Sequence, residues 1–332
     1  MVIQRKLKSK SFNILFTCIG RRVSLLNSFK KAAKELKLQC RFFGTDITEL
    51  SSALQLCDKQ FVVKSVGHQN YIKQLLGIVK RNNVKLLVPT VDLDLYLLAE
   101  NKEKFADAGC IVLVSNKEVV NICQDKRKTF KFLTKNDFDT PITMSACEAL
   151  NKKNIKYPLF SKPWDGYASR GNAIIRNRRD LVFYTKKIPN CIVQEFITGQ
   201  EFTCDVFVDF DMQVRCVVPR NRIETRSGEV SKGKLIKNLK IMYRTAVLVQ
   251  KLGAGPGIIT VQLILKKDGK IKFIEINPRF GGGAPLSIKA GANFPKWILQ
   301  QIIGKNPKIK FDGFENNLVM LRYDDEVWLK KN

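Results

Sequence analysis

The first third of the chain alternates short apolar runs with longer stretches whose apolar positions recur at helical spacing. This alternation predicts a parallel sheet with right-handed helical crossovers, because neighbouring parallel strands are joined through a covering helix. Ligands bind such sheets at the carboxyl ends of the strands, where the loops are 20–22, 45–46 and 89–94. The predicted strands are 13–18, 41–44, 61–64, 85–89 and 110–114, and the predicted helices are 23–36, 71–82 and 93–108.

Beyond residue 115 the pattern becomes mixed. Strand-like runs at 158–163 and 172–176 flank the small-residue loop 164–171, an arrangement typical of a flap. The basic segment 220–234 is expected to be a loop. The other predicted elements are helices at 117–136, 179–187, 236–252 and 294–303 and strands at 191–197, 201–209 and 213–219.

Two apolar runs flank Asp268-Gly269, and an Asp-Gly pair between such runs predicts a β-hairpin with a two-residue type I′ turn. That register places Gln262 opposite Glu275, and alternation places Asn277 on the same face. These three side chains offer oxygen ligands with one formal negative charge, which suits an Mg²⁺ ion that substrate phosphates also hold. The alternative is that they form an ordinary solvated sheet face. The opposite face, expected in the core, carries Ile259, Val261, Leu263, Leu265, Ile274 and Ile276.

The composition is that of a globular protein, since 45% of the 332 residues are hydrophobic and 27% are charged. No apolar run approaches the ~18 residues that cross a bilayer, so no membrane partner is expected. Nine cysteines without Cys-x-x-Cys spacing argue against a disulfide framework or a zinc site and favour a reducing, cytoplasmic setting. The single histidine, His68, excludes multi-histidine metal sites and argues against a histidine-based catalytic triad.

A net charge of +28 raises the question of a nucleic-acid partner. However, the lysines and arginines are spread along the whole chain, and no aromatic-interleaved basic motif or zinc-finger spacing is present. We therefore expect pockets for phosphate and carboxylate groups within a generally basic surface, and no nucleic-acid partner.

Lys162 lies in the middle of a predicted strand, between Phe160 and Trp164. Its side chain either reaches back to the surface or provides a positive charge for a nucleotide phosphate. In the second case the flap at 165–171 would close over the phosphate chain through its backbone N–H groups.

Two further segments bear on nucleotide binding. The strand 194–197, followed by Glu201, offers backbone groups for an adenine edge and a carboxylate for ribose hydroxyls. By contrast, the match of 228–234 to a phosphate-binding loop is attributed to chance, because Leu235 stands where Ser or Thr would bind Mg²⁺.

Taken in order, these segments look like the ATP-grasp superfamily, in the branch that contains the large subunit of carbamoyl-phosphate synthetase and carboxylate–amine ligases. The similarity covers nearly the whole chain. It implies an α/β and α+β fold, with a pre-ATP-grasp parallel α/β domain at 1–115 before a two-subdomain ATP-grasp fold. The small lid subdomain would be 116–192, and the C-terminal subdomain with the Mg-ATP and substrate site would be 193–332. The segments that carry the resemblance are Lys128, 158–163, 166–171, 193–203, Gln262 and 275–279.

The resemblance also implies roles for single residues. The family's Mg²⁺ ligands correspond to Gln262, Glu275 and Asn277, and Mn²⁺ is an alternative metal. Many members have an acidic residue at the position of Gln262, whereas the carbamoyl-phosphate branch has glutamine. ATP would be held by Lys128, Lys162, Gly166, Ser169, Arg170, Gly171, Gln194, Glu195, Phe196, Ile197 and Glu201.

The implied reaction is ATP-dependent ligation of a small-molecule carboxylate to an amine through an acyl phosphate, with ADP and phosphate released. Because a carboxylate is already anionic, this step needs charge neutralisation more than a general base. Arg21, Arg22 and Asp92 would contribute from the first domain. The expected catalytic and substrate-holding residues are Arg279, Lys162, Arg220, Arg222 and Lys232.

Two alternatives stay open at this point. One is a carboxyphosphate- or carbamoyl-phosphate-forming half that works with a partner subunit. The other is a catalytically silent protein that binds nucleotides or nucleic acid. Assembly into a homodimer is also left open.

Overall fold

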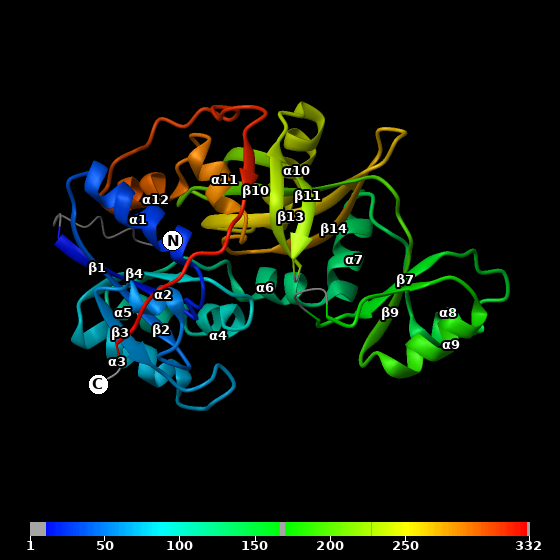
Figure 1. Ribbon diagram of the computed structural model, residues 1–332, viewed down its shortest axis with the longest axis horizontal. Helices are drawn as coiled ribbons and strands as arrows, with labels where there is room; N and C mark the ends of the chain where they lie inside the picture. Colours follow the sequence, from blue (N-terminus) through cyan, green and yellow to red (C-terminus); the bar gives the residue numbers. More distant parts are fainter. Residues whose placement is uncertain (1–10, 167–169, 227, 331–332) are drawn as a thin grey trace.

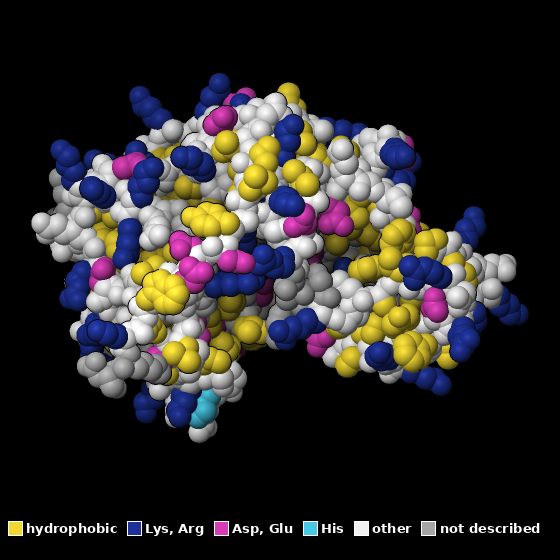
Figure 2. Space-filling view, viewed as in Figure 1, with side chains coloured by type: hydrophobic (Ala, Val, Ile, Leu, Met, Phe, Trp, Pro, Cys, Tyr) yellow, Lys and Arg dark blue, Asp and Glu magenta, His cyan; other side chains and the backbone are white. Residues whose placement is uncertain are grey.

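The computed structural model describes residues 11–166, 170–226 and 228–330, and in these ranges the chain forms three sheets. Figure 1 shows the N-terminal sheet at the lower left, a large C-terminal sheet above it, and a smaller sheet that projects to the right. None of the described helices is long and apolar enough to cross a membrane. Figure 2 shows lysines and arginines over all three regions of the visible face.

The N-terminal sheet is parallel throughout, as predicted, with the strand order β3-β2-β1-β4-β5. The order reverses between β1 and β4, so the loops that follow these two strands lie side by side. Its strands are β1 (Ser11–Thr17), β2 (Gln39–Asp46), β3 (Lys59–Val62), β4 (Val84–Pro89) and β5 (Ile111–Val112). Its helices are α1 (Val23–Glu35), α2 (Ser52–Gln55), α3 (Tyr71–Arg81), α4 (Leu95–Glu100) and α5 (Lys102–Asp107).

Strand β1 connects two apolar cores, because its alternate side chains point to opposite faces of the sheet. Leu15 belongs to a core within the N-terminal domain, whereas Ile14 and Phe16 belong to a core that continues into the C-terminal sheet. At the junction, the rings of Phe29 and Phe280 meet edge to face at 5.8 Å. The first domain and the C-terminal subdomain are thus packed as one body.

Two of the predicted helices are interrupted. The stretch 93–108 forms α4 and α5, which meet at Asn101. The stretch 117–136 forms α6 (Lys117–Gln124) and α7 (Lys126–Lys135). Asp125 has an extended backbone between them, and its carboxylate accepts a hydrogen bond from the Arg127 N–H, which caps α7.

The small sheet has the strand order β6-β9-β7-β8 and an apolar core of its own. Strands β7 and β8 pair antiparallel around the predicted flap, which confirms the strand–loop–strand arrangement. The elements are β6 (Thr143–Ser145), α8 (Ala146–Asn151), β7 (Leu159–Pro163), β8 (Ala173–Ile175), α9 (Arg178–Lys187) and β9 (Cys191–Glu195). The core residues are Ala149, Leu159, Ile175, Leu181 and Val193.

The C-terminal sheet is antiparallel, with the strand order β14-β13-β10-β11-β12-β15. Its strands are β10 (Gln200–Val208), β11 (Val214–Arg226), β12 (Glu229–Leu235), β13 (Gly257–Leu265), β14 (Ile271–Asn277) and β15 (Val319–Leu321). Its helices are α10 (Leu239–Leu252), α11 (Ala284–Lys289) and α12 (Phe294–Ile302). Neither α11 nor β15 was predicted from the sequence.

The prediction of a basic loop at 220–234 was wrong, because most of this segment belongs to the paired strands β11 and β12. Charged residues recur at every second position of β11, at 220, 222, 224 and 226. A two-residue period is typical of a strand, and bulges interrupt the pairing only on either side of Glu224, so the density of charge did not indicate a loop.

The hairpin β13–β14 pairs Gln262 with Glu275, as predicted, but its loop and the register next to the loop differ from the prediction. The two-residue turn was wrong: Lys266 pairs with Lys270 through an N–H···O=C bond of 2.9 Å, and the loop has three residues. Gly269 supplies the left-handed position of this loop, with φ +75°. A bulge at Ile274 then shifts the register by one residue. Consequently Phe273 enters the core, whereas Ile274, predicted to be buried, lines the cleft described below.

At the carboxyl edge of the N-terminal sheet, the buried carboxylate of Asp94 accepts hydrogen bonds from Thr17 Oγ1 at 2.6 Å and from the Tyr71 hydroxyl at 3.0 Å. Its Oδ1 atom has no partner among the described residues. Burial raises the pKa of Asp94 from 3.8 to about 6, because the apolar surroundings disfavour the charged form.

We expect the Asp94→Asn substitution to change the pH dependence of stability. Because the pKa is raised in the folded state, folding favours the protonated form, and the wild type loses stability as the pH rises from about 4 to about 6. The loss approaches about 3 kcal/mol at 1.36 kcal/mol per pKa unit. The variant lacks this ionisable group. Its free energy of unfolding, measured by urea denaturation, should therefore rise relative to that of the wild type as the pH increases from about 4 to about 6. A constant difference between the two proteins would contradict the burial effect.

Candidate active site

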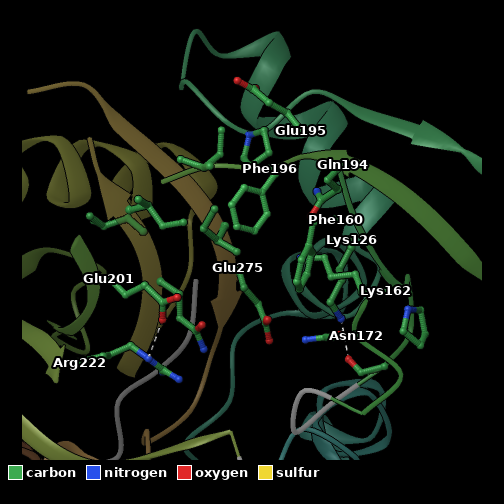
Figure 3. Close-up of a pocket in the computed structure, with 18 of the residues that line it drawn as sticks. Lys126, Phe160, Lys162, Asn172, Gln194, Glu195, Phe196, Glu201, Arg222 and Glu275 are labelled. Atoms are coloured by element: carbon green, nitrogen blue, oxygen red, sulfur yellow. Dashed lines mark hydrogen bonds and ion pairs between the residues drawn. The ribbon is translucent and has the colours of Figure 1, made fainter. Parts of the chain in front are cut away.

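A cleft lies between the small sheet and the C-terminal sheet (Figure 3). Strands β7 and β9 form one wall, and β10, β11, β13 and β14 form the other. The lining residues are Lys126, Pro141, Phe160, Lys162, Pro163, Gly166, Arg170, Asn172, Gln194, Glu195, Phe196, Ile197, Glu201, Phe202, Arg222, Gln262, Leu263, Ile264, Ile274 and Glu275.

One face of the C-terminal sheet is polar because paired residues of an antiparallel sheet share a face. Gln262 pairs with Glu275 across the hairpin, and Thr260 pairs with Asn277 one step further along. The Asn277 side chain helps to lower the pKa of Glu275. Burial would raise the pKa of Glu275, but the positive charges of Lys126 and Lys162 hold it below its ordinary value. A carboxylate and two carboxamides therefore lie together, as the hairpin predicted.

Lys162 lies on β7 and faces the cleft, with only 5% of its surface exposed. Burial lowers its pKa to about 8, although the charge of Glu275 opposes this shift. Its ammonium group makes no hydrogen bond within residues 11–166, 170–226 and 228–330. In Figure 3, Lys162 and Lys126 extend from the wall opposite Glu275. The side chain thus does not reach back to the outer surface.

The structure places Lys126 in the cleft and Lys128, the predicted phosphate ligand, outside the residues that line it. The Lys126 ammonium group donates to the carbonyl oxygen of Gly166 in the flap at 2.6 Å. Lys128 instead donates to the Asn121 side chain at 2.7 Å. A continuous helix was expected here, but the break at Asp125 sets the direction of Lys126. The sequence signal was Asp125 itself, a residue type that caps helices.

The predicted adenine-binding segment lines the cleft as a unit, at 194–197. Gln194 donates to the Thr143 hydroxyl at 2.7 Å, and Glu195 is 3.4 Å from the Lys272 ammonium nitrogen. Glu201 also lines the cleft and forms an ion pair of 3.4 Å with Arg222. Figure 3 shows this ion pair on the wall that carries Glu275.

The flap contributes fewer described residues than predicted. Gly166 and Arg170 line the cleft, and Gly171 has a left-handed backbone with φ +75°. Ser169 lies outside the described residues. Asn172 also lines the cleft and was not predicted.

Of the predicted charge-holding arginines, Arg222 lines the cleft, whereas Arg279 is not among the lining residues. The Nε atom of Arg222 is buried without a hydrogen bond to any described residue. Arg279 follows β14 and contacts Asp92 of the N-terminal domain, with 2.6 Å between Nη2 and Oδ2. Asp92, expected to contribute from the first domain, therefore acts on the orientation of Arg279.

The structure does not bring the other two predicted charge-holding residues into the cleft. Arg220 is 1% exposed and donates to both carboxylate oxygens of Asp205, at 2.7 and 2.9 Å. Lys232 is exposed and pairs with Glu224 at 2.7 Å. Arg220 thus shares the polar face, because it pairs with Thr203 in the same row as Gln262 and Glu275, but Asp205 and the glycine loop 281–283 enclose it. Lys232 lies outside this face.

The donor set fits Mg²⁺ held together with phosphates. No group of three His, Cys, Asp or Glu residues within the described ranges could hold a metal ion by itself. The combination of Gln262, Glu275 and Asn277 supplies only oxygen donors and one negative charge, which leaves coordination positions for phosphate oxygens and water.

Curated relatives of the chain include two ligases. The chain is 23% identical over 162 residues to the D-alanine–D-alanine ligase of Aquifex aeolicus, covering 46% of this chain and 56% of that protein. The alignment thus spans little more than half the length of that relative. With the D-alanine–D-alanine ligase of Fusobacterium nucleatum the identity is 22% over 249 residues, covering 69% of this chain and 85% of that protein.

The fold also occurs in solved structures. The ADP complex of an N5-carboxyaminoimidazole ribonucleotide synthetase matches with a TM-score of 0.71 and 17% identity, covering 94% of this chain and 81% of that one. At this identity the match shows the fold alone. Residues 14–113 match the model of a PylC-like N-terminal domain, and residues 123–283 match the model of an ATP-grasp domain. The chain therefore belongs to the ATP-grasp family, with a PylC-like domain before its ATP-grasp domain.

Proposed function

We propose that the protein is an ATP-dependent carboxylate–amine ligase, which forms an amide through an acyl phosphate and releases ADP and phosphate. The observation that carries this proposal is the arrangement of Glu275 and Gln262 opposite Lys126 and Lys162 in one cleft. Two curated relatives carry the name of ligases that join amino acids, which supports the same reaction class.

The cleft suits phosphoryl transfer to a carboxylate. The attacking oxygen is already anionic, so the protein has to align it and offset charge on the transferring group. Lys126 and Lys162 would contact phosphate oxygens from one wall, and Arg222 would do so from the other. Arg279, held by Asp92 at 2.6 Å, would orient the carboxylate at the end of β14.

Nucleotide and metal have separate places in this proposal. The strand edge at 194–197 would bind the adenine, and Glu201 would accept hydrogen bonds from the ribose. Gln262, Glu275 and Asn277 would hold Mg²⁺, with Mn²⁺ as an alternative. The metal would offset negative charge on the phosphates when bound. A cytoplasmic setting is supported by nine cysteines that are all free.

We expect ADP release from Mg-ATP to depend on an added carboxylate, measured against a panel of amino acids, uronic acids, dipeptides and bicarbonate. Glu275→Gln should abolish this release while leaving the circular dichroism spectrum unchanged. Glu100→Gln is the matched control, because Glu100 is an ion-paired surface residue, 2.6 Å from Lys117. Turnover with bicarbonate alone would favour the carboxyphosphate-forming alternative. Full activity of Glu275→Gln would refute the metal assignment.

Removing the Lys126 ammonium group should weaken nucleotide binding. We expect Lys126→Met to raise the dissociation constant of ADP by about 10-fold or more, since a hydrogen bond to a charged group contributes about 1.5–3 kcal/mol. Lys128→Met removes the same charge two residues away and should have a much smaller effect. Calorimetric titration measures both. If Lys128→Met has the larger effect, the assignment of the phosphate ligand reverts to Lys128.

Nucleotide affinity should fall in alkaline solution. The Lys162 ammonium, with a pKa of about 8, loses its charge as the pH rises through this value. Between pH 7 and pH 9 the apparent dissociation constant of ADP should increase by about 10-fold if only the charged form binds. Lys162→Arg should flatten this dependence, because a guanidinium stays charged over this range. The same pH dependence in both proteins would exclude Lys162 as its source.

A further inference from the structure

Three arginines converge on one carboxylate where the N-terminal domain meets the C-terminal sheet. Glu229, at the start of β12, lies 3.1 Å from Arg22 and 3.3 Å from Arg21, which both follow β1. Arg322, which follows β15, approaches the same carboxylate to 3.2 Å. Segments from both ends of the chain thus supply the positive charge, and a strand between them supplies the negative charge.

The charges of this cluster do not balance. One carboxylate faces three guanidinium groups. The exposed fractions of the Glu229, Arg22 and Arg322 side chains are 25%, 17% and 34%, whereas Arg21 is 69% exposed. Burial would raise the pKa of Glu229, yet Arg22, Arg21 and Arg322 hold it below its ordinary value. Burial also lowers the pKa of Arg22, because desolvation disfavours its charge. A second anion would therefore be stabilised at this position.

The cluster lies outside the lining of the cleft but close to Arg279, because the charges of Arg22 and Glu229 both interact with that guanidinium group. Along β14, Lys272 contacts the adenine-side residue Glu195, and Glu275 and Asn277 come next. The chain then continues through Arg279 into the glycine loop 281–283, away from the adenine side. A carbonyl group of this loop, that of Gly282, accepts a hydrogen bond from Arg322.

The glycine at position 282 allows this close approach. A Cβ atom there would lie 2.8 Å from Arg22 Nη1 and 2.9 Å from the carboxyl carbon of Glu229. The backbone of the loop therefore packs directly against the cluster. This contact couples the cluster to the segment that carries Arg279.

Arg322 lies outside both segments that match family models, 14–113 and 123–283. Strand β15 positions it, because Leu321 pairs with Lys232 of β12 and the Arg322 N–H donates to the Ser231 carbonyl oxygen at 3.0 Å. The pairing gives the guanidinium group of a C-terminal residue a fixed place beside Glu229.

We propose that Arg21, Arg22 and Arg322 bind a second anionic group of the carboxylate substrate, and that the Glu229 carboxylate occupies their site until the substrate arrives. This inference rests on the proposed ligase function. It specifies the substrate as a dianionic acid, with a carboxylate that is activated at Arg279 and a second carboxylate or a phosphate-like group bound by the three arginines. Planar guanidinium groups suit both kinds of anion, since their paired N–H donors match the oxygens of either.

Binding tests this site without turnover. In the presence of Mg-ADP, succinate should raise the melting temperature more than butyrate, which has the same carbon chain and one carboxylate. Arg322→Gln should weaken succinate binding about 10-fold, and Glu229→Gln should strengthen it. 3-Phosphonopropionate in place of succinate distinguishes a phosphate-like second group from a carboxylate. Arg215→Gln is the control, because Arg215 pairs only loosely with Asp209, at 3.7 Å.

Equal stabilisation by succinate and butyrate, or equal effects of Arg322→Gln and Arg215→Gln, would overturn the proposal. Weaker succinate binding by Glu229→Gln would overturn the role of Glu229. With active enzyme, Arg322→Gln should raise KM for diacids and leave kcat and the KM of monoacids unchanged. An absence of turnover with every acid, together with selective succinate binding, would reject the ligase function and retain the anion site.

Discussion

The attraction between the Glu275 carboxylate and the two ammonium groups of Lys126 and Lys162 is the interaction on which the site depends. Glu275 would be costly to bury as an anion, and Lys162 would be costly to bury as a cation, so each makes the charged form of the other tolerable. The three residues come from different elements, namely β14, α7 and β7. Folding therefore has to bring the small sheet, the helix and the large sheet together before any one of these charges becomes favourable. In a bound Mg-nucleotide complex, the metal would face the Glu275 carboxylate and the phosphates would face the two ammonium groups. Each charged side chain would therefore still meet an opposite charge.

The hairpin shows how a correct prediction can follow from a partly incorrect argument. The pairing of Gln262 with Glu275 assumed a two-residue turn, but the loop has three residues and a bulge at Ile274 restores the register. These two departures cancel at Gln262 and Glu275, so the register differs from the predicted one only between the loop and the bulge. Local sequence cues reported the hairpin and its polar face well, because alternation and turn chemistry act over a few residues. Phe273, and not Ile274, enters the core because of packing against the rest of the protein. Local sequence cues carry no information about that packing.

The distinction between local sequence cues and long-range packing also explains where other predictions succeeded or failed. The order of strands and helices in the N-terminal domain, the strand pair around the flap and the strand Cys191–Glu195 followed from periodicity and from the resemblance. The choice between Lys126 and Lys128 depended on one capping residue, Asp125, which redirects a helix. Arg220 and Arg222 have the same charge and lie two residues apart on one strand, yet only the second reaches the cleft, because Asp205 lies beside the first. The position of Arg322 could not be predicted, since β15 is short and its partner β12 is about 85 residues away in sequence.

The separate apolar core of the small sheet has a mechanical consequence. Its five buried residues belong to no other apolar cluster of the described chain. Among the contacts that join it to the large sheet are polar ones: Lys272 pairs with Asp139 at 2.8 Å and with Glu195 at 3.4 Å, and the Thr140 hydroxyl donates to the Phe273 carbonyl oxygen. The small sheet can therefore rotate on its connections without exposing its own core to water. Both ion pairs are made by Lys272, whose side chain is largely buried, so salt would screen these connections only weakly.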